Sequence, residues 1–229
     1  MSISIKLSKR INYLSILDSI SGAFPEILNT GYLKENRHLI KDSHLKMHRE
    51  LNSADMLRGA FLRPITMENL FCDFNTEYDN WWEHEEEKLK DFLKGDFFQK
   101  SEDVINKSCK KVESYIGQSF ESNCYLISAY TGGLLPLTNS FTTSPFSNDP
   151  FGIVIVNFHI WTLLSRYLNK AVNNGISFTD LQRISNYIMV ESGVFLELMN
   201  LVKTDYHKEN VPNFQISGSE REFLKSISC

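Results

Sequence analysis

Residues 123–158 read NCYLISAYTGGLLPLTNSFTTSPFSNDPFGIVIVNF and interrupt an otherwise helical pattern. The two ends of this stretch, residues 123–130 and 151–158, are compact runs of β-branched and aromatic residues, and they predict two strands. Between them, residues 131–150 are rich in Gly, Pro, Ser, Thr and Asn, which is typical of a long loop. This stretch therefore decides that the fold contains a small sheet.

Helical patterns lie on both sides of that stretch. Apolar and aromatic residues between Met67 and Leu93 recur at three- and four-residue steps, which predicts a long amphipathic helix capped by Gly95. Further helices are expected at residues 10–20, after Pro25, and at 34–51, 101–116, 159–174, 179–203 and after Ser219. Many helices with one small sheet predict the α+β class, predominantly helical. No linker divides the sequence, so residues 1–229 are expected to form a single domain.

The composition limits the classes of function that the chain fits. Of its 229 residues, 42% are apolar and 23% are charged, the ordinary balance of a globular protein. A net charge of −4 without a basic stripe disfavours nucleic-acid binding. No apolar run reaches about 18 residues, so no membrane span is expected. The beginning of the chain lacks the apolar stretch of a secretory signal.

The four cysteines stand far apart, at Cys72, Cys109, Cys124 and Cys229, and form no CxxC pair. This spacing disfavours a zinc ribbon or a thioredoxin-type redox site. Reduced, mostly buried thiols are typical of proteins in the cytoplasm, where disulfides rarely persist. A cytoplasmic location is therefore expected.

The loop expected at residues 131–150 is the first candidate site. Connections of this length without secondary structure are uncommon in compact domains and are usually functional or mobile. Gly132 and Gly133 would let the backbone approach a ligand closely, which makes them candidate binding residues. The alternative is a variable surface loop. No Walker lysine follows the glycines, so a nucleotide site has no support.

Glu191 and His159 are the candidate catalytic residues. Glu191 falls on the apolar stripe of the helix expected at residues 179–203, between Ile188 and Phe195. A carboxylate buried there must be paired, protonated or bound to a ligand, and such a group is a candidate general base. The alternative is a helix at the edge of the domain, with Glu191 in solvent. His159 follows the second expected strand, where it either faces a pocket or serves as a partly buried structural histidine.

Residues 188–198, IMVESGVFLEL, resemble the active helix of the zinc peptidases that carry the HExxH motif. In those families two zinc-binding histidines flank a catalytic glutamate, after a strand and a helix in an order similar to residues 151–174 here. Val190 and Val194 stand where both histidines belong, and only Glu191 matches. The resemblance implies a pseudo-enzyme that keeps the scaffold and has lost its zinc and its chemistry.

Other histidines and one cysteine form two further patterns. His44 and His48 stand four residues apart on an expected helix, so their rings share one face, but no third ligand is evident. His84 lies in an acidic run that is typical of a solvated helix face. Cys124 and His159 would be neighbours if the two expected strands pair. Neither pattern is complete, and no metal or cofactor is expected.

Trp81 and Trp82 are adjacent on the long amphipathic helix, so their side chains point about 100° apart. One ring is expected at the edge of the core, beside the acidic residues 83–87. Exposed aromatic side chains are the usual anchors of protein interfaces, and an acidic rim favours a basic partner. The alternative is that two helical layers bury both rings.

No complete catalytic or cofactor motif is present. We therefore expect a non-catalytic cytoplasmic protein that acts by binding another protein, as inhibitors, immunity proteins and pseudo-enzymes do. The alternative is a hydrolase or metal-dependent enzyme in which Glu191 and His159 act beside residues 131–150. Convergence of these groups in the structure would favour the enzyme.

Overall fold

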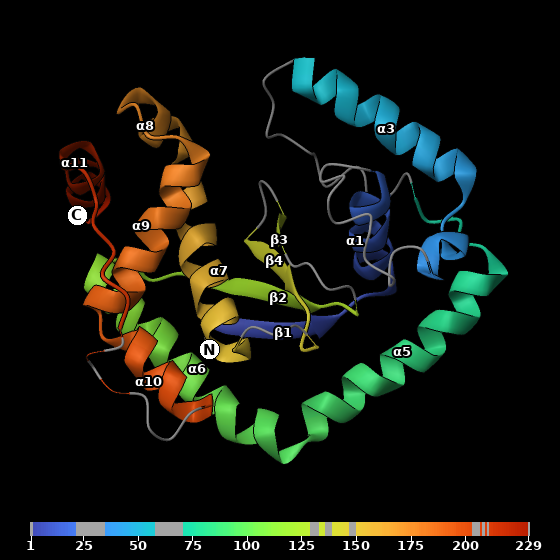
Figure 1. The fold of residues 1–229 in the computed structure, drawn as a ribbon, viewed down its shortest axis with the longest axis horizontal. Coiled ribbons are helices and arrows are strands. Elements are labelled where there is room, and N and C mark those ends of the chain that lie inside the picture. Colours follow the sequence, from blue (N-terminus) through green and yellow to red (C-terminus); the bar gives the residue numbers. More distant parts are fainter. Residues whose placement is uncertain are drawn as a thin grey trace. The chain divides into compact units, whose positions relative to one another are not determined.

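The computed structural model describes residues 2–21, 35–57, 71–128, 133–135, 139–146, 150–202, 207, 209 and 211–228. Helices make up most of these residues, and a small sheet accompanies them (Figure 1). The predicted α+β class, predominantly helical, is confirmed. None of the described helices is long and apolar enough to cross a membrane.

Strands and helices follow an irregular order along the chain. The strands are β1 (Ile3–Leu7), β2 (Ser122–Leu126), β3 (Gly133–Leu135) and β4 (Ser140–Thr143), and their order in the sheet is β1-β2-β4-β3. Strand β3 runs antiparallel to β4. The helices are α1 (Lys9–Ser21), the 3-10 helix η2 (Arg37–Leu39), α3 (Asp42–Leu57), α5 (Thr76–Lys94), α6 (Asp96–Ile116), α7 (Phe151–Ser165), α8 (Leu168–Asn173), α9 (Phe178–Glu191), α10 (Val194–Val202) and α11 (Gly218–Ile227).

The chain divides into two compact units. Unit 1 comprises Met1–Ser4, Gly95–Cys124 and Ser147–Cys229, and unit 2 comprises Ile5–Lys94 and Tyr125–Phe146. Each unit combines segments that are far apart in the sequence, so no linker-like composition marks the division. That all 229 residues form a single domain stays a prediction.

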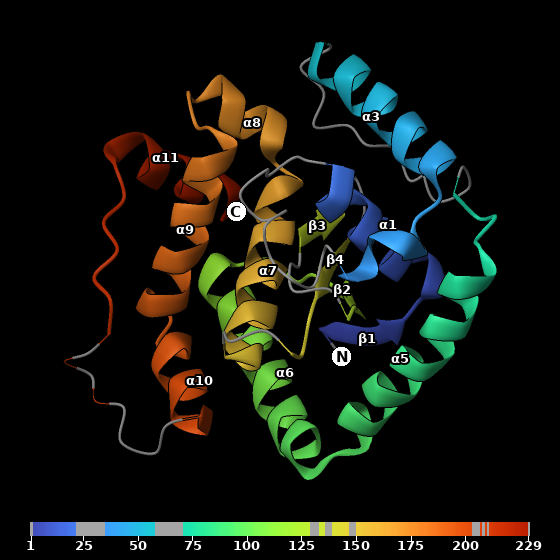
Figure 2. The same ribbon diagram turned by 45° about the vertical axis from the view of Figure 1, so that its right-hand side comes forward.

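Unit 1 is a group of helices around α7. Helix α7 packs against α6, α9 and α10, and α10 also packs against α6 and α9 (Figures 1 and 2). The buried residues of α7 include Ile155, Val156, Ile160, Leu163 and Leu164. Gly152 permits a close approach of α10, because a Cβ at this position would lie 3.1 Å from Leu198 Cδ2. A helix with neighbours on several sides needs no broad polar face.

Unit 2 has a core in which polar side chains lie among aromatic rings. Helix α1 packs against α3, and Tyr13, Phe71 and Tyr78 are fully buried. The buried Asn12 amide donates to the Tyr78 hydroxyl over 3.2 Å and accepts from the Ser128 backbone N–H over 2.8 Å. The polar groups buried in this core thus have hydrogen-bond partners, as folded proteins require.

Residues 151–158 form the first half of helix α7, and the strand predicted there is wrong. A short run of buried apolar residues cannot be assigned to a strand or a helix by periodicity. Here the apolar pattern continues to Leu164, and packing against three helices outweighs the β propensity of the branched residues. The strand predicted at residues 123–130 is confirmed as β2, over Ser122–Leu126.

The helix predicted at residues 179–203 is two helices, α9 and α10. Gly193 separates them in a left-handed conformation with φ of +75°, which a residue with a side chain rarely adopts. Capping boxes at Ser177 and Ser217 begin α9 and α11, each two residues before the position where the helix is expected to start. Several Ser and Thr residues with an acid or amide three positions later fit the capping pattern, so the pattern alone does not choose between them.

Other helix boundaries also differ from the prediction. The long aromatic helix begins at Thr76 as α5, and residues 67–70 lie outside the described residues. Gly95 is the extended N-cap of α6, with φ of −66°, so α6 begins well before Ser101. Gly117 ends α6 as predicted, with φ of +76°. The left-handed conformation identifies Gly117, and not Gly95, as a helix end of the type that glycine favours.

Candidate functional site

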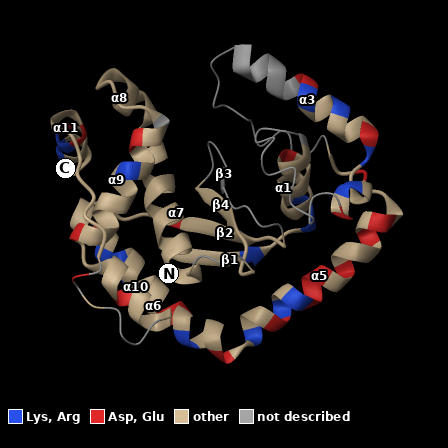
Figure 3. Cartoon of the chain, viewed as in Figure 1, with Lys and Arg blue, Asp and Glu red and all other residues tan. Residues whose placement is uncertain are grey.

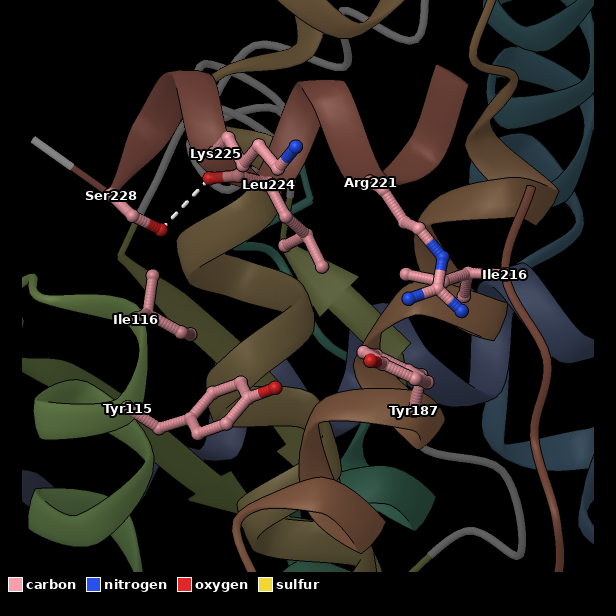
Figure 4. Close-up of a pocket in the computed structure, with 8 residues that line it drawn as sticks. All are labelled: Tyr115, Ile116, Tyr187, Ile216, Arg221, Leu224, Lys225 and Ser228. Atoms are coloured by element: carbon pink, nitrogen blue, oxygen red, sulfur yellow. Dashed lines mark hydrogen bonds between the residues drawn. The ribbon is translucent and has the colours of Figure 1, made fainter. Parts of the chain in front are cut away.

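A surface pocket in unit 1 lies between the C-terminal end of α6, the side of α9 and helix α11 (Figure 4). We name it the α11 pocket. It is lined by Tyr115, Ile116, Tyr187, Ile216, Arg221, Leu224, Lys225 and Ser228. Its volume is about 300 Å³, at the lower end of the range of roughly 300–1,000 Å³ that is usual for ligand sites. The pocket therefore suits a small group and not a large cofactor.

Two interactions hold helix α11 in place beside the pocket. The buried carboxylate of Glu220 closes the capping box of α11 and pairs with Arg183 of α9 at 2.6 Å. At the other end, the Gln118 side-chain amide donates to the Ile227 backbone carbonyl over 2.9 Å. Both ends of α11 are thus attached to neighbouring helices or their ends, and the side chains that α11 presents to the pocket have a fixed backbone.

Two tyrosines from different helices face each other across the pocket (Figure 4). Tyr115 of α6 is 46% exposed, and Tyr187 of α9 is half-buried. Burial, the Tyr187 side chain and the Glu191 carboxylate raise the pKa of Tyr115 to about 12. The Tyr115 phenol keeps its proton at neutral pH, as an ordinary phenol does, and its hydroxyl interacts with the Tyr187 side chain.

Arg221 supplies a positive charge to the pocket. Its guanidinium carbon lies 5.9 Å from the centroid of the Tyr187 ring, a cation–π arrangement. Within the described ranges no carboxylate lies at ion-pair distance from Arg221. Arg183, by contrast, pairs with Glu220 at 2.6 Å and with Asp180 at 2.9 Å. Arg221 is thus a cation that remains available to an anion in the pocket.

Glu191, the predicted general base, is exposed at the last residue of α9. Because it is exposed, it lies outside the apolar core, and its charge contributes to the raised pKa of Tyr115. The stripe that suggested burial is interrupted because the chain turns at Gly193. Residues 188–198 are accordingly divided between two helices, and their resemblance to the zinc-peptidase helix stays a prediction.

His159 is fully buried in α7 and uses both ring nitrogens in internal contacts. Its Nδ1 lies 2.8 Å from Ser122 Oγ, and its Nε2 lies 3.2 Å from Glu113 Oε1. The ring also packs on Phe120, with 5.1 Å between the centroids. A neutral imidazole with its proton on Nε2 donates to Glu113 and accepts from the Ser122 hydroxyl, which satisfies all three groups.

We name Ser122, His159 and Glu113 the His159 row. A hydroxyl, an imidazole and a carboxylate in line are the residue types of a serine hydrolase. Catalysis also requires space for a reacting atom about 3 Å from the nucleophile. Ser122 is 3% exposed and His159 is 0% exposed, so this space is absent around the described residues of the row. The row joins β2, α7 and α6, and in this arrangement it contributes to packing.

Cys124 was expected to pair with His159 if two strands were neighbours, but His159 lies on a helix and its ring nitrogens contact Ser122 and Glu113. Burial raises the pKa of the Cys124 thiol. Burial, followed by the charges of Glu113 and Cys124, also raises the pKa of the Cys109 thiol. Both thiols keep their protons, and neither offers the thiolate that nucleophilic catalysis needs.

His44 and His48 of unit 2 are buried and contact residues of α1. His44 Nδ1 lies 2.8 Å from the Tyr13 hydroxyl, and His48 Nε2 lies 3.5 Å from Asp18. Burial, followed by the charge of Lys41, lowers the pKa of His44. Among the residues that the structure describes, no group of three His, Cys, Asp or Glu side chains is placed to hold a metal ion.

The two tryptophans of α5 differ in exposure. Trp82 is 4% exposed, whereas Trp81 is half-buried and its ring centroid lies 5.7 Å from that of Tyr78. Acidic residues occur along the length of α5 (Figure 3). His84 is exposed among them, on the solvated face that the sequence indicates. A binding role for Trp81 and Trp82 stays a prediction.

The predicted loop at residues 131–150 contains β3 and β4, so it is not without secondary structure. Gly133 is the first residue of β3 and stands opposite Thr142 of β4. Gly132 lies outside the described residues. A binding role for the two glycines stays a prediction.

Comparisons with known proteins add no family to this description. No protein-family model, curated protein or solved structure matches the chain.

Proposed function

We propose that this chain is a non-catalytic cytoplasmic protein that binds another protein through the α11 pocket. The observation that carries the proposal is Arg221, whose guanidinium lies on the Tyr187 ring without a carboxylate partner among the described residues. Arginine and tyrosine are enriched among the residues that dominate binding energy at protein interfaces. The pocket surrounds this pair with phenol donors and apolar side chains.

The setting of the predicted catalytic residues supports binding over catalysis. His159 is sealed in the core and satisfied by Ser122 and Glu113, whereas Glu191 is exposed at the end of α9. No contact among the described residues joins His159 to Glu191. A general base and its partner must lie within hydrogen-bond reach of one reacting group, and these two residues occupy different environments.

The cytoplasmic part of the proposal is supported by the buried thiols. Cys109 and Cys124 are close enough for Cys124 to affect the pKa of Cys109, yet both are free. Buried, protonated thiols without a disulfide are typical of a reducing compartment.

Affinity capture from a native extract of the source cells tests the proposal. Three immobilised baits are compared: the wild type, Arg221→Gln and Arg166→Gln. Arg166 is a matched control because its exposed guanidinium also lies over an aromatic ring, that of Phe120, at 5.2 Å and outside the pocket. We expect a protein that wild type and Arg166→Gln retain equally and that Arg221→Gln retains at one tenth or less. Equal retention by all three baits would contradict the proposal.

A hydrolase is the second candidate, and the residue types of the His159 row favour it. This candidate requires the core to open so that a substrate reaches Ser122. A fluorophosphonate reagent, which labels activated serines, tests it directly on the folded protein. Labelling of Ser122 that is lost in His159→Gln would establish the hydrolase, and we expect no labelling.

A further inference from the structure

The charges around the α11 pocket define the ligand that it accepts. Among the described residues Arg221 has no carboxylate partner, whereas Lys225 pairs with Glu222 at 3.0 Å. Glu191 adds a negative charge near Tyr115. The Glu191 charge opposes the binding of an anion, and it repels a doubly charged phosphate more strongly than a singly charged group.

The donors of the pocket fit a carboxylate. A guanidinium presents paired N–H groups that match the two oxygens of a carboxylate. Tyr115 and Tyr187 add hydroxyl groups from the side opposite α11 (Figure 4). Because Tyr115 remains protonated at neutral pH, its hydroxyl is able to donate to an anion.

The rest of the lining is apolar and small. Ile116 and Ile216 are almost fully buried, and Leu224 is half-buried. With a volume of about 300 Å³, the pocket has room for one apolar side chain and the adjoining backbone. An acidic group alone would leave the exposed part of Leu224 uncovered.

We infer that the α11 pocket binds the carboxyl terminus of a partner polypeptide that ends in an aliphatic residue, with the terminal carboxylate on Arg221. The last side chain then packs against Leu224, the half-buried apolar side chain of the lining. Capture of a terminal carboxylate is one of the recurring ways in which proteins recognise peptides. The inference rests on the proposed protein-binding function and names the part of the partner that is recognised.

Titration of the isotope-labelled full chain, followed by NMR, tests this inference. The probes are acetyl-Gly-Gly-Leu with a free carboxylate, the same peptide with a terminal amide, free N-acetyl-leucine and phenyl phosphate. We expect the peptide acid to bind at least tenfold more tightly than the amide and phenyl phosphate, and more tightly than N-acetyl-leucine. Arg221→Gln should weaken the peptide acid at least tenfold, whereas Arg166→Gln should change its Kd by less than twofold.

Four other outcomes of the titration overturn the inference. Equal affinities for the peptide acid and the peptide amide would show that the pocket does not recognise a carboxylate. Tighter binding of phenyl phosphate would show that the preferred anion is a phosphate. If N-acetyl-leucine binds as tightly as the peptide acid, the ligand is a small apolar acid and not a polypeptide. If no probe binds at millimolar concentration, the pocket is not a binding site for these groups. Arg221-dependent capture of a protein without peptide binding would leave the proposed function intact. Peptide binding without such capture would contradict the proposed function alone.

Discussion

The C-terminal end of α6 carries two sites of opposite character. Glu113 points into the core and meets His159, whereas Tyr115, two residues later, points to the α11 pocket. Side chains two residues apart on a helix point about 200° apart, so one helix end serves both sides. The sealed side, formed by Glu113 and His159, has the residue types of an active site but is closed to solvent. The open side, formed by Tyr115 and the α11 pocket, has groups suited to ligand recognition. Residue type alone therefore does not reveal function, because access to solvent decides which polar groups can act on a ligand.

The largest effect is expected on the sealed side. His159→Leu should lower the free energy of unfolding by about 3 kcal/mol, because Glu113 and Ser122 lose their partner within the core. Urea denaturation measures this loss. The sealed site would then be confirmed as part of the packing.

Ser122→Ala provides the graded control for that measurement. It keeps the hydrogen bond between His159 and Glu113 and removes only the Ser122 hydroxyl, so a loss of about 1 kcal/mol is expected. If His159→Leu changes the free energy of unfolding no more than a surface substitution does, the proposed structural role of His159 and Glu113 is contradicted.

A smaller effect, on ionisation, is expected on the open side. Tyr115 has an ordinary pKa of 10.0 and a folded pKa of about 12, so folding favours its protonated form. The resulting stability is present below about pH 10 and is lost as the pH rises towards 12. We expect the phenol of Tyr115 to remain protonated at about pH 11, as measured by carbon NMR with Tyr115→Phe for assignment.

Two glutamates sharpen this test of the open side. Glu191→Gln should lower the pKa of Tyr115, because the Glu191 charge contributes to its rise. Glu197→Gln is the matched control, since Glu197 is exposed and pairs with Lys111. An unchanged Tyr115 pKa in Glu191→Gln would show that the Glu191 charge does not act on the pocket.

The smallest effect is expected for the stability of Arg221→Gln, which should change the free energy of unfolding by less than about 0.5 kcal/mol. Arg221 is exposed and has no ion pair among the described residues. Arg183→Gln should destabilise the protein more, because the buried Glu220 loses its cation. Denaturation curves in urea compare the two variants, and a larger loss for Arg221→Gln would make Arg221 a structural residue.

Much of the fold follows from local sequence signals. The periodicity of α5, the glycine that ends α6 and the turn-rich stretch after β2 are all readable, because each depends on neighbouring residues. The first half of α7, residues 151–158, is predicted as a strand because its residues favour both structures, and contacts with distant helices decide between them. The break at Gly193 was missed because a glycine within an apolar pattern does not show its φ in the sequence.

The candidate site is harder to predict from the sequence than the fold is. Tyr115, Tyr187 and Arg221 lie on three helices that are far apart in the sequence, and no spacing rule connects them. The signal that was available is the amphipathic pattern of α11 with a free arginine, but the sequence does not show which arginine has a partner. Glu191 was singled out for burial, yet its relevance comes from its charge beside Tyr115.

One measurement tests the central claim that the open side binds a partner while the sealed side only stabilises the fold. It compares, at a temperature where every bait is folded, the amount of partner captured by wild type, Arg221→Gln and Ser122→Ala. The account predicts that Arg221→Gln loses at least nine tenths of the partner with unchanged stability, and that Ser122→Ala keeps the partner despite reduced stability. Loss of the partner in Ser122→Ala and its retention in Arg221→Gln would contradict the account.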